Sequence, residues 1–311
     1  MLSRHFYRAK ALQAVYAFRT SDASDTAVGE LRFAYHIKHL NDLSTFQLDA
    51  LMRFVAVVDR MQQDAKRKFM PTQDDLNPSR NLVENSFMAI LAANSELSAR
   101  RSGVTEVPDI DSVLKKAYIA YRDNNAYKTY SRLKQPTFDD DKQAVLALFK
   151  YLMNYEPLID LISERSLLWD DDFAQIAQLN FAMLRGIEAS AADDFPMPPA
   201  YDESSPKEQE DYEFGRRLFM HTLHHFDENE PLIRKYLQGW EYDRIPLVDI
   251  IIINLAVTEL TTCPTVPVIV TIDECVELAK EFSSDKSRLF VNGIIDKIVA
   301  DLRSQRRIGD K

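Results

Sequence analysis

The stretch that decides the fold lies near the C-terminus and spans residues 240–303: WEYDRIPLVDIIIINLAVTELTTCPTVPVIVTIDECVELAKEFSSDKSRLFVNGIIDKIVADLR. Its first part is an apolar run from Ile245 to Leu260, interrupted by Asp249, Asn254 and Glu259. A proline-punctuated turn follows, and then two stretches with apolar residues at helical spacing. This order predicts a set of packed helices and contains no catalytic constellation.

One short segment inside this stretch is ambiguous. Val266–Ile272 reads VPVIVTI, a β-branched composition that is typical of a strand. It is followed by Thr271-Ile272-Asp273-Glu274, in which Thr and Glu have the spacing of a helix capping box. We therefore predict an extended connector, and then a helix capped by Thr271. Ser284 or Asp285 is expected to cap the last helix.

Composition limits the class of protein. The chain has 311 residues, of which 46% are hydrophobic and 28% charged, enough for a sizeable core. Its 7 glycines argue against glycine-rich phosphate loops and turn-rich sheets. No run is apolar enough to span a membrane, no secretory signal is readable, and 2 cysteines make no disulfide framework. We expect a cytoplasmic, all-α protein.

The net charge of −10 restricts any nucleic-acid binding to a local patch. The clearest basic segment is the helix predicted over 4–18, which carries Arg4, Arg8 and Lys10 with no acidic residue before Asp22. Arg4 and Arg8 share one helix face, close to the positive end of the helix dipole. With Tyr16 nearby, this segment is a candidate surface for phosphates and stacked bases.

Helical patterns continue through the long middle of the chain. For the whole chain we predict five segments: 1–22, a basic first helix; 23–135, an inserted helical region; 136–192, insertion or core helices; 193–210, a loop rich in proline and acid; and 211–311, a C-terminal helical region. The run Lys66-Arg67-Lys68 is basic, but Asp64 and Asp74-Asp75 lie close by in the sequence. We interpret it as a solvated helix end, with an RNA contact as the alternative.

Other polar clusters predict no chemistry. His221, His224 and His225 lack signposted partner ligands, so a polar helix face is favoured over a metal site. The triplets Asp139–Asp141 and Asp170–Asp172 precede periodic runs and are interpreted as helix N-termini. No nucleophile elbow, Walker A loop or dinucleotide fingerprint occurs. No enzyme activity, metal or cofactor is expected.

Blocks at both ends of the chain resemble one known family. They are Arg8–Tyr16 (RAKALQAVY), Leu255–Leu260 (LAVTEL), Val266-Pro267, Ile272–Lys280 (IDECVELAK) and Phe290–Lys297 (FVNGIIDK). Their order and spacing resemble the NusB family of bacterial transcription antitermination factors. The resemblance covers about a third of the chain, roughly 1–21 and 214–303, and leaves a large helical insertion between.

The resemblance implies an all-α fold of two small helical bundles, here with an inserted helical region. It implies a binding protein that recognises boxA-type single-stranded RNA of nascent ribosomal transcripts. The partners implied are the ribosomal protein NusE, other Nus factors and RNA polymerase. The alternatives are a helical interaction scaffold without RNA binding and the NusB-like part of an RNA methyltransferase. The second would need a following nucleotide-binding domain, and this chain ends just after the block.

The resemblance also implies roles for individual positions. The implied RNA contacts are Arg4, Arg8, Lys10, Tyr16, Lys286 and Phe290. Tyr16 is also an implied partner contact, together with Asp243 and Asp249. The N-terminus is less arginine-rich than is usual in the family, which weakens the expected phosphate contacts.

Overall fold

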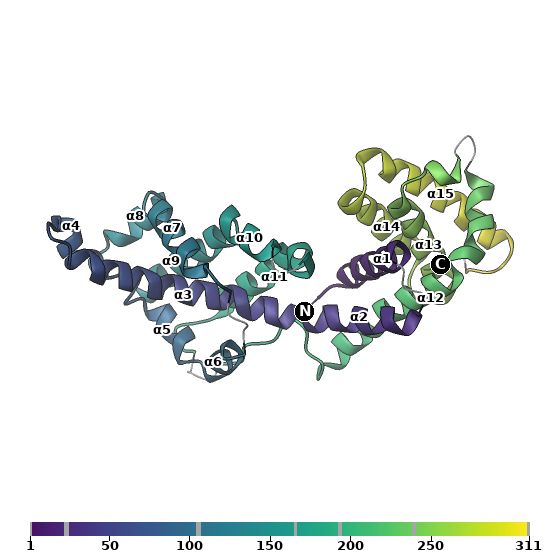
Figure 1. The fold of residues 1–311 in the computed structure, drawn as a ribbon. Helices are drawn as coiled ribbons and strands as arrows, with labels where there is room; N and C mark the ends of the chain where they lie inside the picture. The colour runs from purple at the N-terminus through teal and green to yellow at the C-terminus, as the bar shows by residue number, and fades with distance from the viewer. Residues whose placement is uncertain are drawn as a thin grey trace. The chain divides into compact units, whose positions relative to one another are not determined.

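The computed structural model describes residues 2–21, 25–103, 107–164, 167–191, 195–237 and 241–309. Every regular element in these ranges is a helix, which confirms the all-α prediction (Figure 1). The chain forms two compact units, Met1–Ile37 with Asp202–Lys311 (unit 1) and Lys38–Tyr201 (unit 2). The five segments predicted from the sequence remain a proposal beside this division.

Unit 1 is built around two buried helices. Its elements are α1 (Arg4–Thr20), α2 (Thr26–Lys38), α12 (Pro206–Tyr236), a short 3₁₀ turn (Tyr242–Arg244), α13 (Leu247–Thr262), α14 (Val268–Phe282) and α15 (Asp285–Ser304). Every residue of α13 from Asp249 to Leu260 is buried, so this helix forms the centre of the core. The first helix packs against α12 and α13, and α14 packs against α13 and α15.

The N-terminal part of unit 1 extends further along the chain than the first helix. Phe33 of α2 stacks on Phe219 of α12 with ring centroids 5.7 Å apart. Phe33 and Ile37 are both fully buried. Because these contacts bury the apolar face of α2, this helix belongs to the core of unit 1.

Unit 2 is arranged along one long helix. Its elements are α3 (Leu40–Lys66), α4 (Gln73–Leu76), α5 (Ser86–Ala93), α6 (Ser95–Arg101), α7 (Ile110–Tyr121), α8 (Asn125–Ser131), α9 (Phe138–Leu152), α10 (Glu156–Ser163) and α11 (Leu167–Gly186). Phe54 of α3 is fully buried and meets Tyr118 and Tyr121 of α7 edge-on. Ser44 donates a hydrogen bond to Asn180 of α11 at 2.7 Å, which satisfies two buried polar groups.

Local signals explain several helix starts. Thr137 caps α9 in a reciprocal capping box with Asp140, so the triplet Asp139–Asp141 lies at a helix N-terminus as predicted. Ser284 caps α15 by accepting a hydrogen bond from the Ser287 amide, as predicted. The predicted capping box of Thr271 is wrong. The helix α14 begins at Val268 after Pro267, and Thr271 lies buried inside it.

Most of one long helix, α12, lies in the C-terminal region predicted from residue 211, and it continues through Pro231 because Phe226 and Ile233 are anchored in the core on either side. The loop predicted before this region is corrected. Within the loop predicted over 193–210, Met197 is buried and α12 already begins at Pro206. Asp193, where that loop was predicted to start, lies outside the described residues.

Candidate functional site

The basic first helix is an interior element of unit 1. Half-buried or buried positions run along its N-terminal half, and Tyr7, Arg8 and Lys10 are all buried. Burying charged groups is costly unless each one is paired and hydrogen-bonded. The arrangement of carboxylates around α1 therefore decides what its cations can do.

Arg8 forms a buried ion pair with Glu259 of α13. Its Nε donates to Glu259 Oε2 at 2.8 Å and its Nη2 donates to Oε1 at 2.6 Å, in a two-point contact. The two side chains are 2% and 1% exposed. Burial lowers the pKa of Arg8, but the hydrogen bonds and charge of Glu259 outweigh it and raise that pKa above its ordinary value. The guanidinium is thus fixed in the core and faces no solvent.

Glu259 also receives a third hydrogen bond. The Thr271 hydroxyl of α14 donates to Glu259 Oε1 at 3.0 Å. One carboxylate of α13 therefore joins the next helix, α14, to α1, whose Arg8 lies 251 positions earlier in the chain. This explains why Thr271 lies inside α14, since its hydroxyl satisfies a buried acceptor.

Arg4 lies one helical turn before Arg8 and is paired at the edge of the unit. Its Nε donates to Asp211 at 2.8 Å and its Nη2 to Glu210 at 2.6 Å. The hydrogen bond to Asp211 is the main cause that raises the pKa of Arg4. The ring of Phe214 lies 5.3 Å from the Arg4 guanidinium and 4.9 Å from that of Arg8. Arg4 keeps 35% of its side chain exposed, so it retains access to solvent.

Lys10 is also engaged within the unit. Its Nζ donates to the Gln13 side chain at 2.7 Å and lies 5.4 Å from the ring centroid of Phe6. The three cations predicted to contact RNA phosphates thus all have partners inside unit 1. A phosphate contact by any of them remains a prediction, and for Arg8 it would require the buried pair to open.

The N-terminal turn of α1 lies near the junction of α14 and α15. His5 Nδ1 is 2.6 Å from Glu274, and its Nε2 is 3.1 Å from Glu281, near the end of α14. Glu281 lies in the last turn of α14 and Lys286 in the first turn of α15, so His5 contacts the helix end that leads into Lys286. Tyr16 lies about 18 Å further along α1, at 1.5 Å rise per residue.

The start of α15 presents an exposed face. Lys286 is exposed and makes no ion pair with another described residue, and Phe290 one turn later is half-buried. Gly293 follows on the same side of the helix. A methyl group at Gly293 would meet nothing within 4 Å among the described residues. This stretch of backbone is therefore open to close approach from outside.

Tyr16 and the two predicted acidic contacts differ in exposure. Tyr16 is 42% exposed near the C-terminal end of α1. Asp243 is exposed in the 3₁₀ turn, with its carboxylate 3.6 Å from Arg234. Asp249 is buried in the first turn of α13. Its carboxylate therefore lies inside unit 1, where a partner could reach it only if that turn opened.

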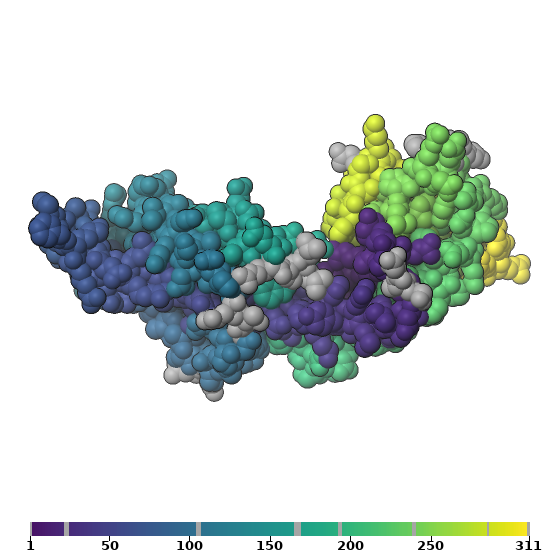
Figure 2. All heavy atoms as spheres, viewed as in Figure 1, coloured from purple at the N-terminus to yellow at the C-terminus, as the bar shows by residue number. Residues whose placement is uncertain are grey.

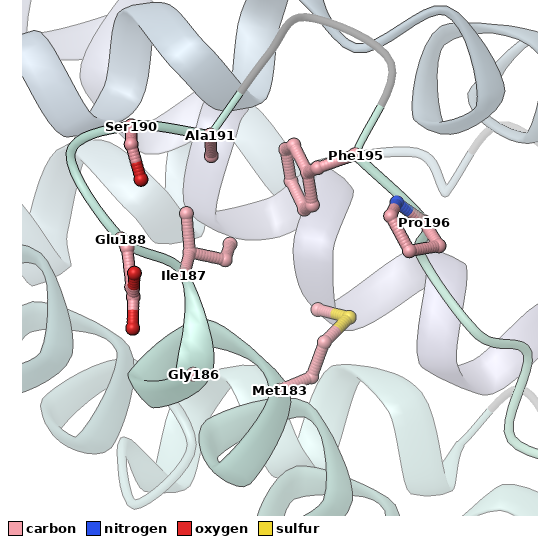
Figure 3. Close-up of a pocket in the computed structure, with 8 residues that line it drawn as sticks. All are labelled: Met183, Gly186, Ile187, Glu188, Ser190, Ala191, Phe195 and Pro196. Atoms are coloured by element: carbon pink, nitrogen blue, oxygen red, sulfur yellow. The ribbon is translucent and has the colours of Figure 1, made fainter.

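A pocket near the end of α11 is lined mostly by uncharged side chains. It lies in unit 2, has a volume of about 390 Å³ and is lined by the end of α11 and the segment after it. Figure 3 shows the side chains of Ile187, Phe195 and Met183 around it, and Glu188 is the one ionisable residue among the described residues that line it. No group of three metal-ligating side chains occurs within the described ranges. Nor is any helix there long and apolar enough to cross a membrane.

The reactivity of the two cysteines provides a simple chemical test of the core of unit 1. Burial, and then the charge of Glu259, raise the pKa of the Cys275 thiol, whereas Cys263 is half-buried. Since the thiolate is the reactive form, we expect Cys275 to react with a disulfide reagent at least about a hundredfold more slowly than Cys263. One thiol should titrate rapidly in the native protein and both in denaturant. Equal rates in the native protein would contradict the buried position of Cys275.

Comparison with known proteins matches the C-terminal part of the chain. The profile of the NusB family matches residues 176–300, from α11 to α15. The transcription antitermination protein NusB of Bacillus subtilis is 39% identical over 89 residues, which are 29% of this chain and 68% of that protein. The NusB of Bacillus pumilus is 39% identical over 98 residues, 32% of this chain and 75% of that protein.

The chain belongs to the NusB family. The NusB of Salinibacter ruber is 40% identical over 96 residues, 31% of this chain and 60% of that protein. The chain thus covers less than two thirds of this NusB relative. No solved structure matches the chain significantly. The NusB profile includes Glu259, Lys286 and Gly293, whereas α1 and most of unit 2 lie outside its range.

Sequence analysis missed Glu259, which organises this NusB-like core. The signal was present, because Glu259 is an isolated acid in a helix whose neighbours are apolar. A buried carboxylate requires a cation or several donors. The arginines of the first helix, which have no acidic residue near them in the sequence, were the available partners.

Proposed function

We propose that this protein is a transcription antitermination factor that binds boxA-type single-stranded RNA together with the ribosomal protein NusE. Membership of the NusB family is the observation that carries this proposal, since the matched relatives are named transcription antitermination proteins. The activity is binding without turnover. Other Nus factors and RNA polymerase would join the same assembly.

The RNA surface is proposed at the start of α15. Lys286 supplies a cation without an ion pair among the described residues, and Phe290 supplies a half-buried ring. At Gly293 the backbone is open, so a phosphate or base could approach more closely than past a larger residue. Phosphate contacts position single-stranded RNA and stacked rings hold its bases.

Arg4, Arg8 and Lys10 take different parts in this proposal. Arg4 is half-buried and could exchange Glu210 for a phosphate while it keeps Asp211. Arg8 holds α1 in place through Glu259. Lys10 remains a predicted contact that would have to leave Gln13.

The NusE surface is proposed at the other end of α1. Arg19 lies 3.4 Å from Asp227 of α12. Arg234, further along α12, lies 3.6 Å from Asp243 and 4.2 Å from the ring centroid of Tyr242, so the 3₁₀ turn and this end of α1 both lie against the C-terminal half of α12. Exposed Asp243 and Tyr16 would therefore meet a basic partner together. Asp249 would contribute only through the stability of α13.

The test is RNA binding by a variant that keeps its fold. Gly293→Leu with Lys286→Ala should weaken binding of a labelled boxA-type RNA at least about tenfold, because it fills the open backbone and removes a phosphate contact. Fluorescence anisotropy with and without NusE measures the affinity. The titration is repeated between about 50 and 200 mM salt, the range over which phosphate contacts weaken strongly. Gly186→Leu is the matched control, since its glycine is also unobstructed but lies in unit 2.

Internal pairing of the α1 cations favours one second candidate, a helical interaction scaffold without RNA binding. The same titration separates the two functions. Salt-sensitive binding by the unmodified protein, with or without NusE, supports the antitermination factor. Absence of such binding in both conditions would refute the proposed antitermination function and support the interaction scaffold.

A further inference from the structure

Unit 2 contains a larger hollow that the proposed function does not use. It has a volume of about 920 Å³ and is lined by the end of α3, the α4 corner, α7 and α8. In Figure 1 these helices lie at one end of unit 2, and Figure 2 shows the surface of the α3–α4 corner in dark blue. We refer to this hollow as the α7–α8 groove.

The two walls of the α7–α8 groove differ in charge. The α7–α8 wall carries exposed cations that make no ion pair with another described residue: Lys115, Arg122 and Arg132. The remaining cations of the lining are neutralised, because Lys68 pairs with Asp75 and Lys128 with Asp123. On the α3–α4 wall, the exposed carboxylates of Asp64 and Asp74 make no ion pair within the part of the chain that the structure describes.

This basic wall stands out in an acidic protein. Residues 110–134 contain 6 lysines and arginines and 2 aspartates, although the whole chain has 38 basic and 48 acidic residues. Unpaired cations held on one side of a concave surface concentrate positive potential there. Such a wall favours a ligand with several negative groups.

Aromatic groups also line the groove. Tyr118 and Tyr127 come from α7 and α8, with their hydroxyl oxygens 3.2 Å apart. Tyr127 is half-buried, so part of its surface remains accessible. Cations beside an accessible aromatic ring are the combination that holds single-stranded nucleic acid.

We propose that the α7–α8 groove binds a second segment of single-stranded RNA. Its phosphates would follow Lys115, Arg122 and Arg132, while base amino groups face the carboxylates of Asp64 and Asp74. The inference extends the proposed function and rests on it in so far as the occupant is RNA.

The carboxylate wall decides between RNA and other anionic partners. An acidic peptide or an anionic lipid surface presents mainly negative groups to the groove, which Asp64 and Asp74 would repel. An RNA strand has phosphates on one side and hydrogen-bond donors on its bases on the other. It therefore complements both walls of the groove.

The test uses the full-length protein and a labelled, unstructured RNA of about 30 nucleotides, long enough to occupy more than one site. The groove variant is Lys115→Ala, Arg122→Ala and Arg132→Ala. The matched control is Lys116→Ala, Lys134→Ala and Lys150→Ala, which removes the same charge from exposed positions outside the lining.

The groove variant should bind this RNA at least about tenfold more weakly. Its plot of log K against log salt should also be shallower, with a slope less negative by about 2, because three phosphate contacts are lost. The control should stay within about threefold of the unmodified protein. Equal losses in both variants, or no loss in either, overturn the inference. So would loss of binding to phosphatidylserine vesicles with RNA binding unchanged.

The outcomes also separate this inference from the proposed function. Binding of boxA-type RNA that depends on Lys286 and Gly293 but not on the groove would overturn the inference alone. RNA binding that depends on the groove but not on Lys286 and Gly293 would support it and overturn the proposed α15 site.

Discussion

Replacing Arg8 with alanine is expected to destabilise unit 1 by about 3–5 kcal/mol, the usual cost of removing one partner of a buried ion pair. The change would leave the Glu259 carboxylate 1% exposed with a single hydroxyl donor, from Thr271. It would also remove one of the two cations that lie against Phe214. Because domains are commonly stable by only about 5–15 kcal/mol, partial unfolding of unit 1 should be visible.

Hydrogen exchange read by mass spectrometry is the suitable measurement, because it separates the two units in one experiment. Protection should fall in peptides of α1, α13 and α14, and stay unchanged in α3 and α11. Arg32→Ala is the matched control, since Arg32 is exposed on α2 and makes no ion pair with a described residue. A loss of protection in Arg8→Ala no larger than in this control would refute a structural role for Arg8.

A double replacement distinguishes the pair from simple packing. With Arg8→Met and Glu259→Met together, no charge remains buried, and such exchanges are often nearly neutral. We expect the double variant to be more stable than Arg8→Ala by at least about 2 kcal/mol. This also means that alanine replacement of Arg8 cannot test RNA binding directly, because lost binding would follow from lost structure.

Helical class and family followed from the sequence because both depend on patterns along the chain. Apolar residues at helical spacing predict helices wherever they occur. The blocks around Leu255–Leu260 and Phe290–Lys297 preserve such a pattern together with particular residues. The matches to NusB relatives fall in the same part of the chain.

The start of α14 could not be predicted because two start signals overlap. Thr271 and Glu274 have capping-box spacing, but Pro267 begins the helix one turn earlier. The extended connector predicted over Val266–Ile272 is wrong from Val268 onward, where the β-branched residues Val268–Val270 lie in the first turn of α14 and only Val268 of the three is buried. Thr271 is used instead as a donor to Glu259.

The environment of the candidate site was equally out of reach. Arg4, Arg8 and Lys10 were predicted to contact phosphates because the N-terminal segment contains no acidic residue. The carboxylates that pair with Arg4 and Arg8 come from residues more than 200 positions away in the chain. The local sequence therefore shows that the first helix carries a net positive charge. Long-range contacts determine which of its cations face solvent.

Filling the space at Gly215 is the second change with a large expected effect. This glycine of α12 lies where α1 and α2 cross it, and a methyl group there would be 2.9 Å from Tyr7 Cβ and 3.3 Å from Phe33. Tyr7 Cβ is fixed by the α1 backbone and cannot rotate away. A larger side chain must therefore push α1 off α12.

We expect Gly215→Leu to destabilise unit 1 by about 3 kcal/mol, because overpacking exceeds the gain in helix propensity of about 1 kcal/mol. Gly293→Ala is the matched control, as it offers the same gain in propensity without an obstruction and should stabilise by about 1 kcal/mol. Thermal unfolding and hydrogen exchange of α1 measure both. Displacement of α1 would strain the Arg8–Glu259 pair as well, so Gly215→Leu combined with Arg8→Ala should cost less than the two separate losses together. Full additivity would show that the crossing at Gly215 and the buried ion pair hold α1 independently.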